Sequence, residues 1–202
     1  MQFQSTRDPN TIVSSSEAIL RGLAPDGGLF VPTAFPKAEL EDWKSLSYPE
    51  LAQKVLAGFL TDYDPAFLGE AAAATYGDAF AGKAGYVQKV HDGLYSLELW
   101  HGPTCAFKDF GAGFMGRMTG LLGAADEKLV ILTATSGDTG SAVAHGFHNV
   151  PGVEVVVLYP EGKISRLQEC QMTALGGNIH PLRVAGTFDD CQRLVKELFA
   201  DA

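Results

Sequence analysis

The stretch Leu129-Val-Ile-Leu-Thr-Ala-Thr-Ser-Gly-Asp-Thr-Gly140 decides the fold of this chain. Its first half, Leu129–Thr133, is an apolar run typical of a strand that is buried on both faces. Its second half is rich in glycine and hydroxyl side chains, as loops are. A helix is expected to follow over Gly140–His148. The stretch therefore predicts a strand, a loop and a helix, which is how a βαβ unit begins.

The same order of elements continues to the end of the sequence. The apolar patterns predict further strands at Val153–Tyr159 and Ile179–Val184, and further helices at Ser165–Leu175 and Phe188–Ala200. A glycine-rich helix over Lys108–Leu122 comes before them. Strands and helices that alternate at this spacing imply right-handed βαβ units. We therefore expect an α/β fold with an open parallel sheet and helices on both faces.

The first 85 residues have a different pattern, which is mostly helical. Ser14 and Glu17 have the spacing of a capping box, with Ser14 as N-cap. Prolines at two expected helix starts lie in the first turn, where the missing N–H does no harm. The elements expected in this region are helices at Glu17–Leu23, Pro49–Leu60 and Pro65–Tyr76 and a strand at Leu29–Val31. From about residue 86 the pattern changes, and strands are expected at Tyr86–Val90 and Leu94–Trp100. We predict an N-terminal region over residues 1–85 and, over 86–202, the N-terminal part of a second domain that is truncated at its C-terminal end.

Composition limits the classes of function. The 202 residues are 46% hydrophobic and 19% charged with a net charge of −9, which is typical of a soluble globular protein. The negative charge argues against a nucleic-acid partner and against an anionic membrane surface. Three widely spaced cysteines suggest neither a disulfide framework nor a zinc site, and the histidines form no metal set. A polar N-terminus is no signal peptide, so the expected location is cytoplasmic.

A second informative stretch is His101-Gly-Pro-Thr-Cys-Ala-Phe-Lys-Asp-Phe-Gly111. It places Lys108 between two phenylalanines, and apolar neighbours disfavour the ammonium form of a lysine. A neutral amine can form a Schiff base with an aldehyde cofactor, which raises pyridoxal 5'-phosphate chemistry as a hypothesis. The alternative is a lysine on a solvated helix face. We expect Cys105, which has no identifiable base beside it, to be a small core residue.

The loop Thr133–Gly140 and the turn Gly162–Ser165 follow two of the expected strands. Backbone N–H groups at a helix N-terminus bind a carboxylate or phosphate, although the same pattern also suits an ordinary helix cap. Asp138 would repel an anion, so it must point away or play some other role. Lys163 and Ser165 could hold a phosphate, or Lys163 could be a solvated turn lysine. In open α/β sheets, ligands bind beyond the carboxyl ends of strands.

Gly111-Ala-Gly-Phe-Met-Gly116 matches the pattern G-x-G-x-x-G. A dinucleotide fingerprint needs a strand directly before it and an acidic residue about twenty positions later. This stretch has neither. We therefore expect these glycines to face a tightly packed sheet or a cofactor.

Taken together, these motifs resemble the threonine synthases, pyridoxal-phosphate enzymes of the tryptophan-synthase-β-like fold type. The resemblance covers essentially the whole chain. Besides the Lys108 stretch and the Thr133–Gly140 loop, it rests on Gly22–Pro32, Pro160–Ser165 and Leu175–Ile179. Related sulfhydrylases and dehydratases carry asparagine at the position of Asp138, which favours threonine synthase over them.

The resemblance implies a lyase that converts O-phosphohomoserine and water to threonine and phosphate, the last step of threonine biosynthesis. Lys108 would hold pyridoxal 5'-phosphate as a Schiff base and would act as base and acid. The residues that would bind the substrate are Thr135, Ser136, Gly137, Asp138 and Thr139 for its α-carboxylate, and Lys163, Ser165 and Gln168 for its phosphate. No metal is implied.

Whole members of the family continue past this point with a glycine-asparagine-rich loop that grips the cofactor phosphate. Neither that loop nor the residue that faces the pyridine nitrogen is found in these 202 residues. We therefore expect the N-terminal part of the enzyme, with weak cofactor binding and little or no turnover alone. The alternatives are a threonine dehydratase or cysteine synthase of the same fold, and a non-catalytic homologue that binds a phosphorylated metabolite. The oligomeric state stays open.

Overall fold

A computed structural model describes residues 1–122 and 128–200. The chain divides into two compact units, Met1–Ala73 and Ala74–Ala202, and each is described by itself. The predicted domain boundary after residue 85 differs from this division and stays a prediction.

The first unit holds a three-stranded antiparallel sheet in the order β2-β1-β3. Ser14 is the N-cap of α1 as predicted, because its side chain accepts a hydrogen bond from the Glu17 N–H over 3.1 Å. Strands β1 and β2 and the short α2 were not predicted, since they are only three or four residues long. The elements are β1 (Gln2–Ser5), β2 (Ile12–Ser14), α1 (Ser15–Arg21), β3 (Phe30–Pro32), α2 (Leu40–Trp43), α3 (Tyr48–Phe59) and α4 (Pro65–Tyr76), the last of which runs on into the second unit.

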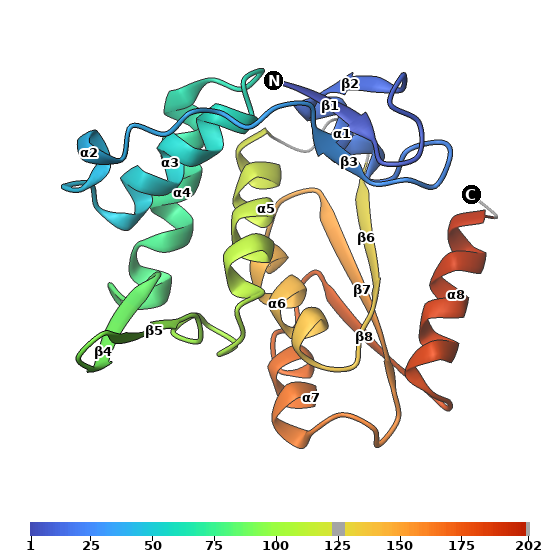
Figure 1. Ribbon diagram of the computed structural model, residues 1–202. Coiled ribbons are helices and arrows are strands. Elements are labelled where there is room, and N and C mark those ends of the chain that lie inside the picture. The colour runs from blue at the N-terminus through green and yellow to red at the C-terminus, as the bar shows by residue number, and fades with distance from the viewer. Residues whose placement is uncertain (123–127, 201–202) are drawn as a thin grey trace. The chain divides into compact units, whose positions relative to one another are not determined.

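The second unit is built on a three-stranded parallel sheet in the order β6-β7-β8. Figure 1 shows α5, α6 and α7 on one side of this sheet and α8 on the other. Its elements are η1 (Asp78–Phe80), β4 (Tyr86–His91), β5 (Leu94–Glu98), α5 (Asp109–Leu122), β6 (Leu129–Ala134), α6 (Asp138–Phe147), β7 (Val153–Pro160), α7 (Arg166–Thr173), β8 (Ile179–Val184) and α8 (Phe188–Ala200). The predicted α/β class with helices on both faces of a parallel sheet is confirmed.

Strand β7 is the central strand of the described sheet, and it is buried along most of its length, as predicted. The prediction that Leu129–Thr133 is buried on both faces is wrong. Strand β6 is an edge strand of the described sheet, and Leu129 and Val130 are 44% and 56% exposed. An apolar run alone does not distinguish an edge strand from a central one, because a strand in either position packs apolar side chains on the core.

The core of the second unit lies between the sheet and helices α6 and α7. Its buried members are Ala144, Phe147, Val150, Val153, Val155, Val157, Tyr159, Met172 and Ile179. Helix α5 packs closely on α6, since a Cβ atom on Gly116 would overlap the carbonyl oxygen of Gly146. Gly116 of the G-x-G-x-x-G pattern therefore faces a neighbouring helix, and not the sheet or cofactor that the sequence led us to expect.

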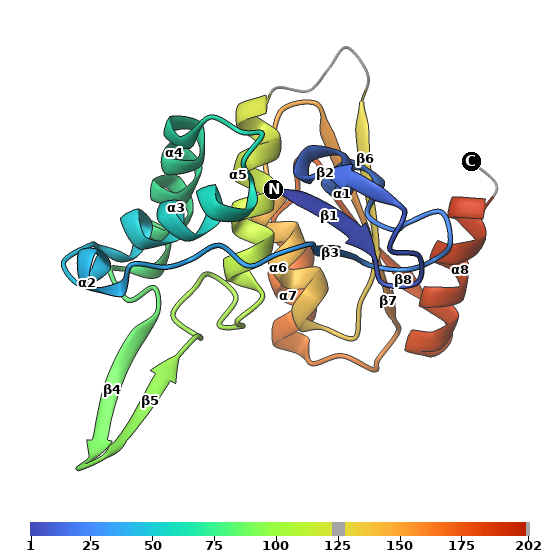
Figure 2. The same cartoon turned by 45° about the horizontal axis from the view of Figure 1, so that its top comes forward.

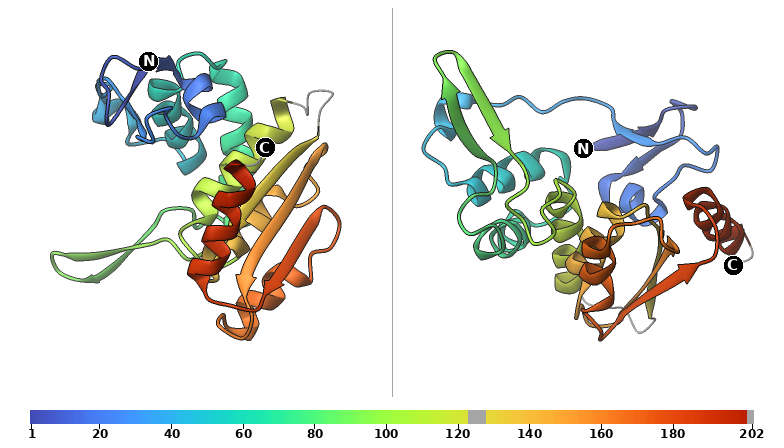
Figure 3. Two further views of the ribbon diagram at one scale, coloured as in Figure 1. Left: turned by 90° about the vertical axis from the view of Figure 1, so that its right-hand side faces the viewer. Right: turned by 90° about the horizontal axis from the view of Figure 1, so that it is seen from below.

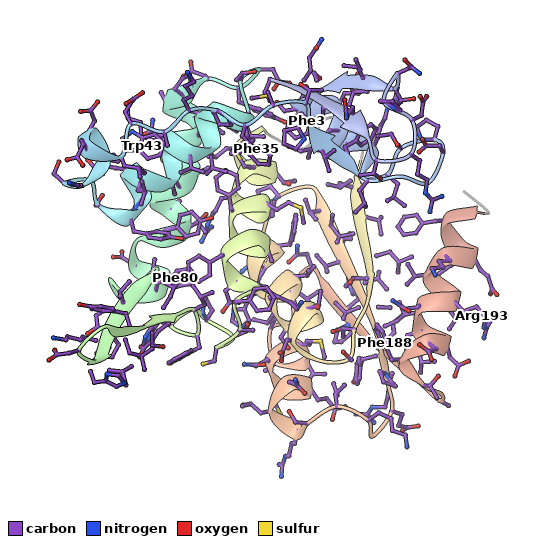
Figure 4. All side chains as sticks on the ribbon, in the orientation of Figure 1. Phe3, Phe35, Trp43, Phe80, Phe188 and Arg193 are labelled. Carbon is purple, nitrogen blue, oxygen red and sulfur yellow. The ribbon has the colours of Figure 1, made fainter. Side chains whose placement is uncertain are left out.

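The β4–β5 hairpin extends as a long two-stranded ribbon (Figure 2). Phe80 points toward α5 (Figure 4), and its ring centroid lies 4.6 Å from that of Phe110. Figure 3 gives two further views of the sheet and of α8 beside it. Among the described residues, no helix has the length and apolar character needed to cross a membrane.

Candidate active site

Lys108 is the last residue before α5, at the end of the loop His101–Lys108. The loop is held by Asp109, whose side chain is 4% exposed. The Thr104 N–H donates to Asp109 Oδ2 over 2.9 Å, and the Thr104 hydroxyl donates to Oδ1 over 2.6 Å. Gly102 leaves room for this arrangement, because a Cβ atom there would lie 2.5 Å from Asp109 Oδ2. The loop before Lys108 is therefore fixed by buried hydrogen bonds.

The Lys108 side chain is half-buried, and its Nζ atom lies 4.8 Å from the centroid of the Phe107 ring. Phe107 itself is 62% exposed, so it does not enclose the amine as the sequence suggested. Phe110 packs against Phe80 instead. Within the described residues, no carboxylate forms an ion pair with Lys108. The Lys108 amine, at the end of the loop His101–Lys108, is therefore available to react with an aldehyde.

The prediction that Cys105 is a small core residue is wrong, because its side chain is exposed. Its φ angle is 59°, in the left-handed region that residues other than glycine seldom adopt. Such a conformation is strained and persists only where its surroundings fix it. The Cys105 N–H donates to the Gly102 carbonyl oxygen over 3.1 Å, which holds the backbone at this residue.

Thr135 lies buried inside the second predicted loop, Thr133–Gly140. Its side chain is 1% exposed, and its Oγ1 atom accepts hydrogen bonds from the Gly137 N–H over 2.9 Å and from the Gly140 N–H over 2.8 Å. Gly137 has a φ angle of 141°, which only glycine adopts readily. Thr135 and Gly137 therefore shape the loop from within.

The exposed side of the same loop carries Ser136, Asp138 and Thr139. Among the hydrogen bonds of the described residues, none is donated by the backbone N–H groups of these three. They lie at the start of α6, where the helix dipole also favours a negative charge. This combination can bind a small anion such as a carboxylate.

Asp138 has a specific partner, which the sequence could not identify. Its Oδ1 atom accepts a hydrogen bond from Gln168 Nε2 over 2.8 Å. The other atom of that amide, Gln168 Oε1, accepts from the Ser165 N–H over 3.0 Å, within the capping box of α7. Lys163 is exposed in the turn before this cap. The structure therefore joins the Thr135–Gly140 loop to the Gly162–Ser165 turn through Gln168.

Gln171 makes a second connection from α7. Its Nε2 atom donates to the carbonyl oxygen of Thr104 over 3.2 Å. Figure 1 shows the carboxyl ends of β6 and β7 and the start of α5 on the same, lower side of the second unit. Sequence reasoning missed Thr104, Asp109 and Gln171, although the Thr-x-x-x-x-Asp spacing before a helix was visible.

Two histidines lie near this region. His101 Nε2 lies 2.6 Å from Glu98 Oε2. His145 lines a cavity of about 60 Å³ together with Asp109 and Arg117. Burial lowers the pKa of His145, while the charge of Asp109 acts against this and His148 adds to it. Both His145 and His148 are half-buried, and no group of described His, Cys, Asp or Glu side chains is arranged to hold a metal ion.

Comparison with known proteins bears on this arrangement. The family described as "Threonine synthase N terminus" matches residues 2–76. The family described as "Pyridoxal-phosphate dependent enzyme" matches residues 86–202, which hold Lys108 and both loops. The chain belongs to the pyridoxal-phosphate-dependent enzyme family. The expected resemblance to the threonine synthases is confirmed.

Several threonine synthases are similar over the whole chain. The chain is 44% identical over 204 residues to that of Escherichia coli (strain K12) and 37% identical over 216 residues to that of Schizosaccharomyces pombe, and it spans 46% and 42% of those proteins. The solved structure of threonine synthase with bound pyridoxal phosphate from Brucella melitensis matches with a TM-score of 0.92 at 35% identity. That match covers all of this chain and 45% of the other. The chain thus spans about half the length of the relatives it matches.

The residues present fit the aldehyde end of pyridoxal phosphate, the family's cofactor. An aldehyde needs a primary amine that is not tied to a carboxylate, and Lys108 has one at a rigid loop. A substrate amino acid needs an anion site, and Ser136, Asp138 and Thr139 supply free N–H groups. The described residues offer no comparable cradle that we can assign to the cofactor phosphate.

Proposed function

We propose that this chain carries the lysine and the substrate loop of a threonine synthase, which converts O-phosphohomoserine and water to threonine and phosphate. One observation carries the proposal. Helix α7 donates one hydrogen bond to Thr104, in the loop that carries Lys108, and another to Asp138, in the Thr135–Gly140 loop. The 44% identity to a threonine synthase over the whole chain supports the choice of reaction.

Lys108 has two tasks in this proposal. Its amine would hold the cofactor covalently, and with substrate bound the freed Lys108 amine would accept and return protons at Cα and Cβ of the substrate. Pyridoxal phosphate, when bound, supplies the electron sink that makes these carbon acids accessible. Phosphate would leave from Cγ, Cγ would take up a proton to become the methyl group of threonine, and water would add at Cβ. An amine on a loop that Asp109 fixes can serve both tasks without a large movement.

The start of α6 orients the substrate. The N–H groups of Ser136, Asp138 and Thr139, with the hydroxyls of Ser136 and Thr139, bind the α-carboxylate. Thr135 and Gly137 act from within the loop by setting its shape. Asp138 acts through Gln168, whose amide donates a hydrogen bond to its carboxylate.

Lys163 supplies positive charge for the substrate's phosphate from its exposed turn. Ser165 and Gln168 hold that turn through the capping box of α7, so their part in phosphate binding is mainly to fix Lys163.

We keep the cytoplasm as the proposed compartment, because none of the three cysteines forms a disulfide among the described residues.

The 202 residues alone should turn over substrate little or not at all, because they span about half the length of the relatives. The product formed, however little, identifies the reaction. Where turnover is detected with added pyridoxal phosphate, we expect O-phosphohomoserine to give threonine, and Lys108→Ala to give none. Formation of 2-oxobutanoate from threonine, or of cysteine from O-acetylserine and sulfide, would favour the dehydratase or the cysteine synthase instead. Robust turnover by the isolated chain would contradict the expectation of an incomplete site.

A further inference from the structure

Two glutamines of α7 reach two different loops. Gln168 Nε2 donates to Asp138 Oδ1 over 2.8 Å, and Gln171 Nε2 donates to the Thr104 carbonyl oxygen over 3.2 Å. Residues three apart lie on the same face of a helix. One face of α7 therefore contacts both the loop that carries Lys108 and the loop that begins α6.

Helix α7 is itself fixed to the sheet. Met172 is fully buried in the core of the second unit. The Glu169 carboxylate accepts hydrogen bonds from Arg183 Nη2 over 2.6 Å and from the Tyr159 hydroxyl over 3.0 Å. Arg183 belongs to β8 and Tyr159 to β7. These contacts anchor the helix to two strands, so its side chains can act as fixed reference points for the loops.

The connection to Lys108 runs through Thr104 and Asp109. Gln171 holds the Thr104 carbonyl oxygen, while the N–H and the hydroxyl of Thr104 are held by Asp109. Asp109 is the residue after Lys108 and the first of α5. A displacement of Thr104 would therefore move the backbone from which the Lys108 side chain extends.

We propose that Gln171 is a positioning residue for Lys108, and that α7 sets the spacing between the Lys108 amine and the anion-binding loop. This inference rests on the proposed function. There the Lys108 amine must approach two carbons of a substrate whose carboxylate is bound by the Thr135–Gly140 loop. Reacting atoms have to approach to about 3–3.5 Å, so small errors in spacing slow proton transfer.

The first test compares two matched variants by amide hydrogen exchange. Gln171→Met and Gln168→Met each remove one donor with little change in volume, and Gln192→Met on the exposed face of α8 controls for the chemical change. In Gln171→Met we expect the Thr104 and Cys105 amides to exchange about 3–10-fold faster, as loss of one hydrogen bond predicts. In Gln168→Met the Gly137 and Gly140 amides should change instead.

The second test measures the rate at which pyridoxal phosphate, trapped by borohydride, labels Lys108. Gln171→Met should slow labelling of Lys108 by about 3-fold or more, with labelling of Lys163 unchanged, whereas Gln192→Met should label Lys108 at the normal rate. Unchanged exchange at Thr104 in Gln171→Met, or faster exchange there with an unchanged labelling rate, overturns the proposal. If the unmodified chain formed no Lys108 adduct, the proposed function would fail, and the exchange comparison would still decide whether Gln171 fixes the loop.

Discussion

Asp138 Oδ1 and Gln168 Nε2 lie 2.8 Å apart, joined by a hydrogen bond that spans 30 residues of sequence. It ties the loop after β6 to the first turn of α7, and it gives the carboxylate a role other than binding an anion. A Cβ atom on Gly137 would overlap this same Gln168 amide, so the glycine is needed for the approach.

Two substitutions of Asp138 distinguish the effect of its charge from the effect of its hydrogen bond. Asp138→Asn keeps an oxygen that accepts from Gln168, so the Gly137 and Gly140 amides should keep their exchange rates. Removal of the negative charge should strengthen O-phosphohomoserine binding up to about 5-fold at low salt, since unit charges about 4 Å apart repel by about 1 kcal/mol in water. Asp138→Ala should lose the hydrogen bond and speed exchange of those amides. Titration calorimetry and hydrogen exchange measure the two effects, and equal behaviour of both variants would contradict this role.

Thr135 should be required for the stability of the α6 loop. Thr135→Val is nearly isosteric but leaves the buried N–H groups of Gly137 and Gly140 without an acceptor. An unsatisfied buried donor costs about 1–3 kcal/mol, and we expect a loss of unfolding free energy in that range. Thr135→Ser keeps the oxygen and should lose about 1 kcal/mol for the missing methyl group. Urea unfolding measures both, and a valine variant that loses less than about 1 kcal/mol would rule out the internal role.

The close packing of α5 on α6 gives a prediction with an internal control. Gly116→Ala places a methyl group against the carbonyl oxygen of Gly146 and should destabilise the fold by at least about 1–3 kcal/mol. Gly111→Ala lies in the same helix with open space around it, and it should stabilise the fold by about 0.5–1 kcal/mol. Thermal and urea unfolding of the two variants should change in opposite directions. A shift of both in the same direction would show that this helix pair is not packed as described.

The sequence predicted most of the second unit because its strands and helices are long and strongly patterned. Helix α8 and strand β8 have the predicted bounds, and Gly140–His148 was placed within two residues of α6 at its start. The edge position of β6 could not be predicted, since pairing order is decided by contacts between distant segments. The short β1 and β2 carry too few residues for a periodic signal.

The site was predictable in its residues and less so in their roles. Lys108 and the Thr135–Gly140 loop stood out by composition. That Thr135 faces inward, and that Phe107 is exposed while Phe110 packs on Phe80, depends on side-chain directions that a linear motif does not contain. Gln171 had no local signal, because its partner Thr104 lies 67 residues away.

The half-buried imidazole of His145 predicts how the free energy of unfolding depends on pH. Burial lowers the pKa of His145 below its ordinary value of 6.5, although Asp109 opposes the shift. Below about pH 6.5 the unfolded chain therefore binds a proton that the folded chain resists, and stability should fall as the pH is lowered from 7 toward 5. His145→Gln should make this fall shallower while leaving the other titrating groups in place. Unfolding in urea at pH 7.5, 6.5 and 5.5 measures it, and identical slopes for the two proteins would refute the assignment.

The assignment of Lys108 can be tested by one labelling experiment. The purified chain is incubated with pyridoxal phosphate, reduced with borohydride and digested, and the modified peptide is identified by mass spectrometry. We predict one dominant phosphopyridoxyl group, on Lys108, which is absent in Lys108→Ala and reduced when O-phosphohomoserine is added before reduction. Modification spread evenly over exposed lysines such as Lys163, or the same yield in Lys108→Ala, would contradict the assignment of Lys108 as the residue that holds the cofactor.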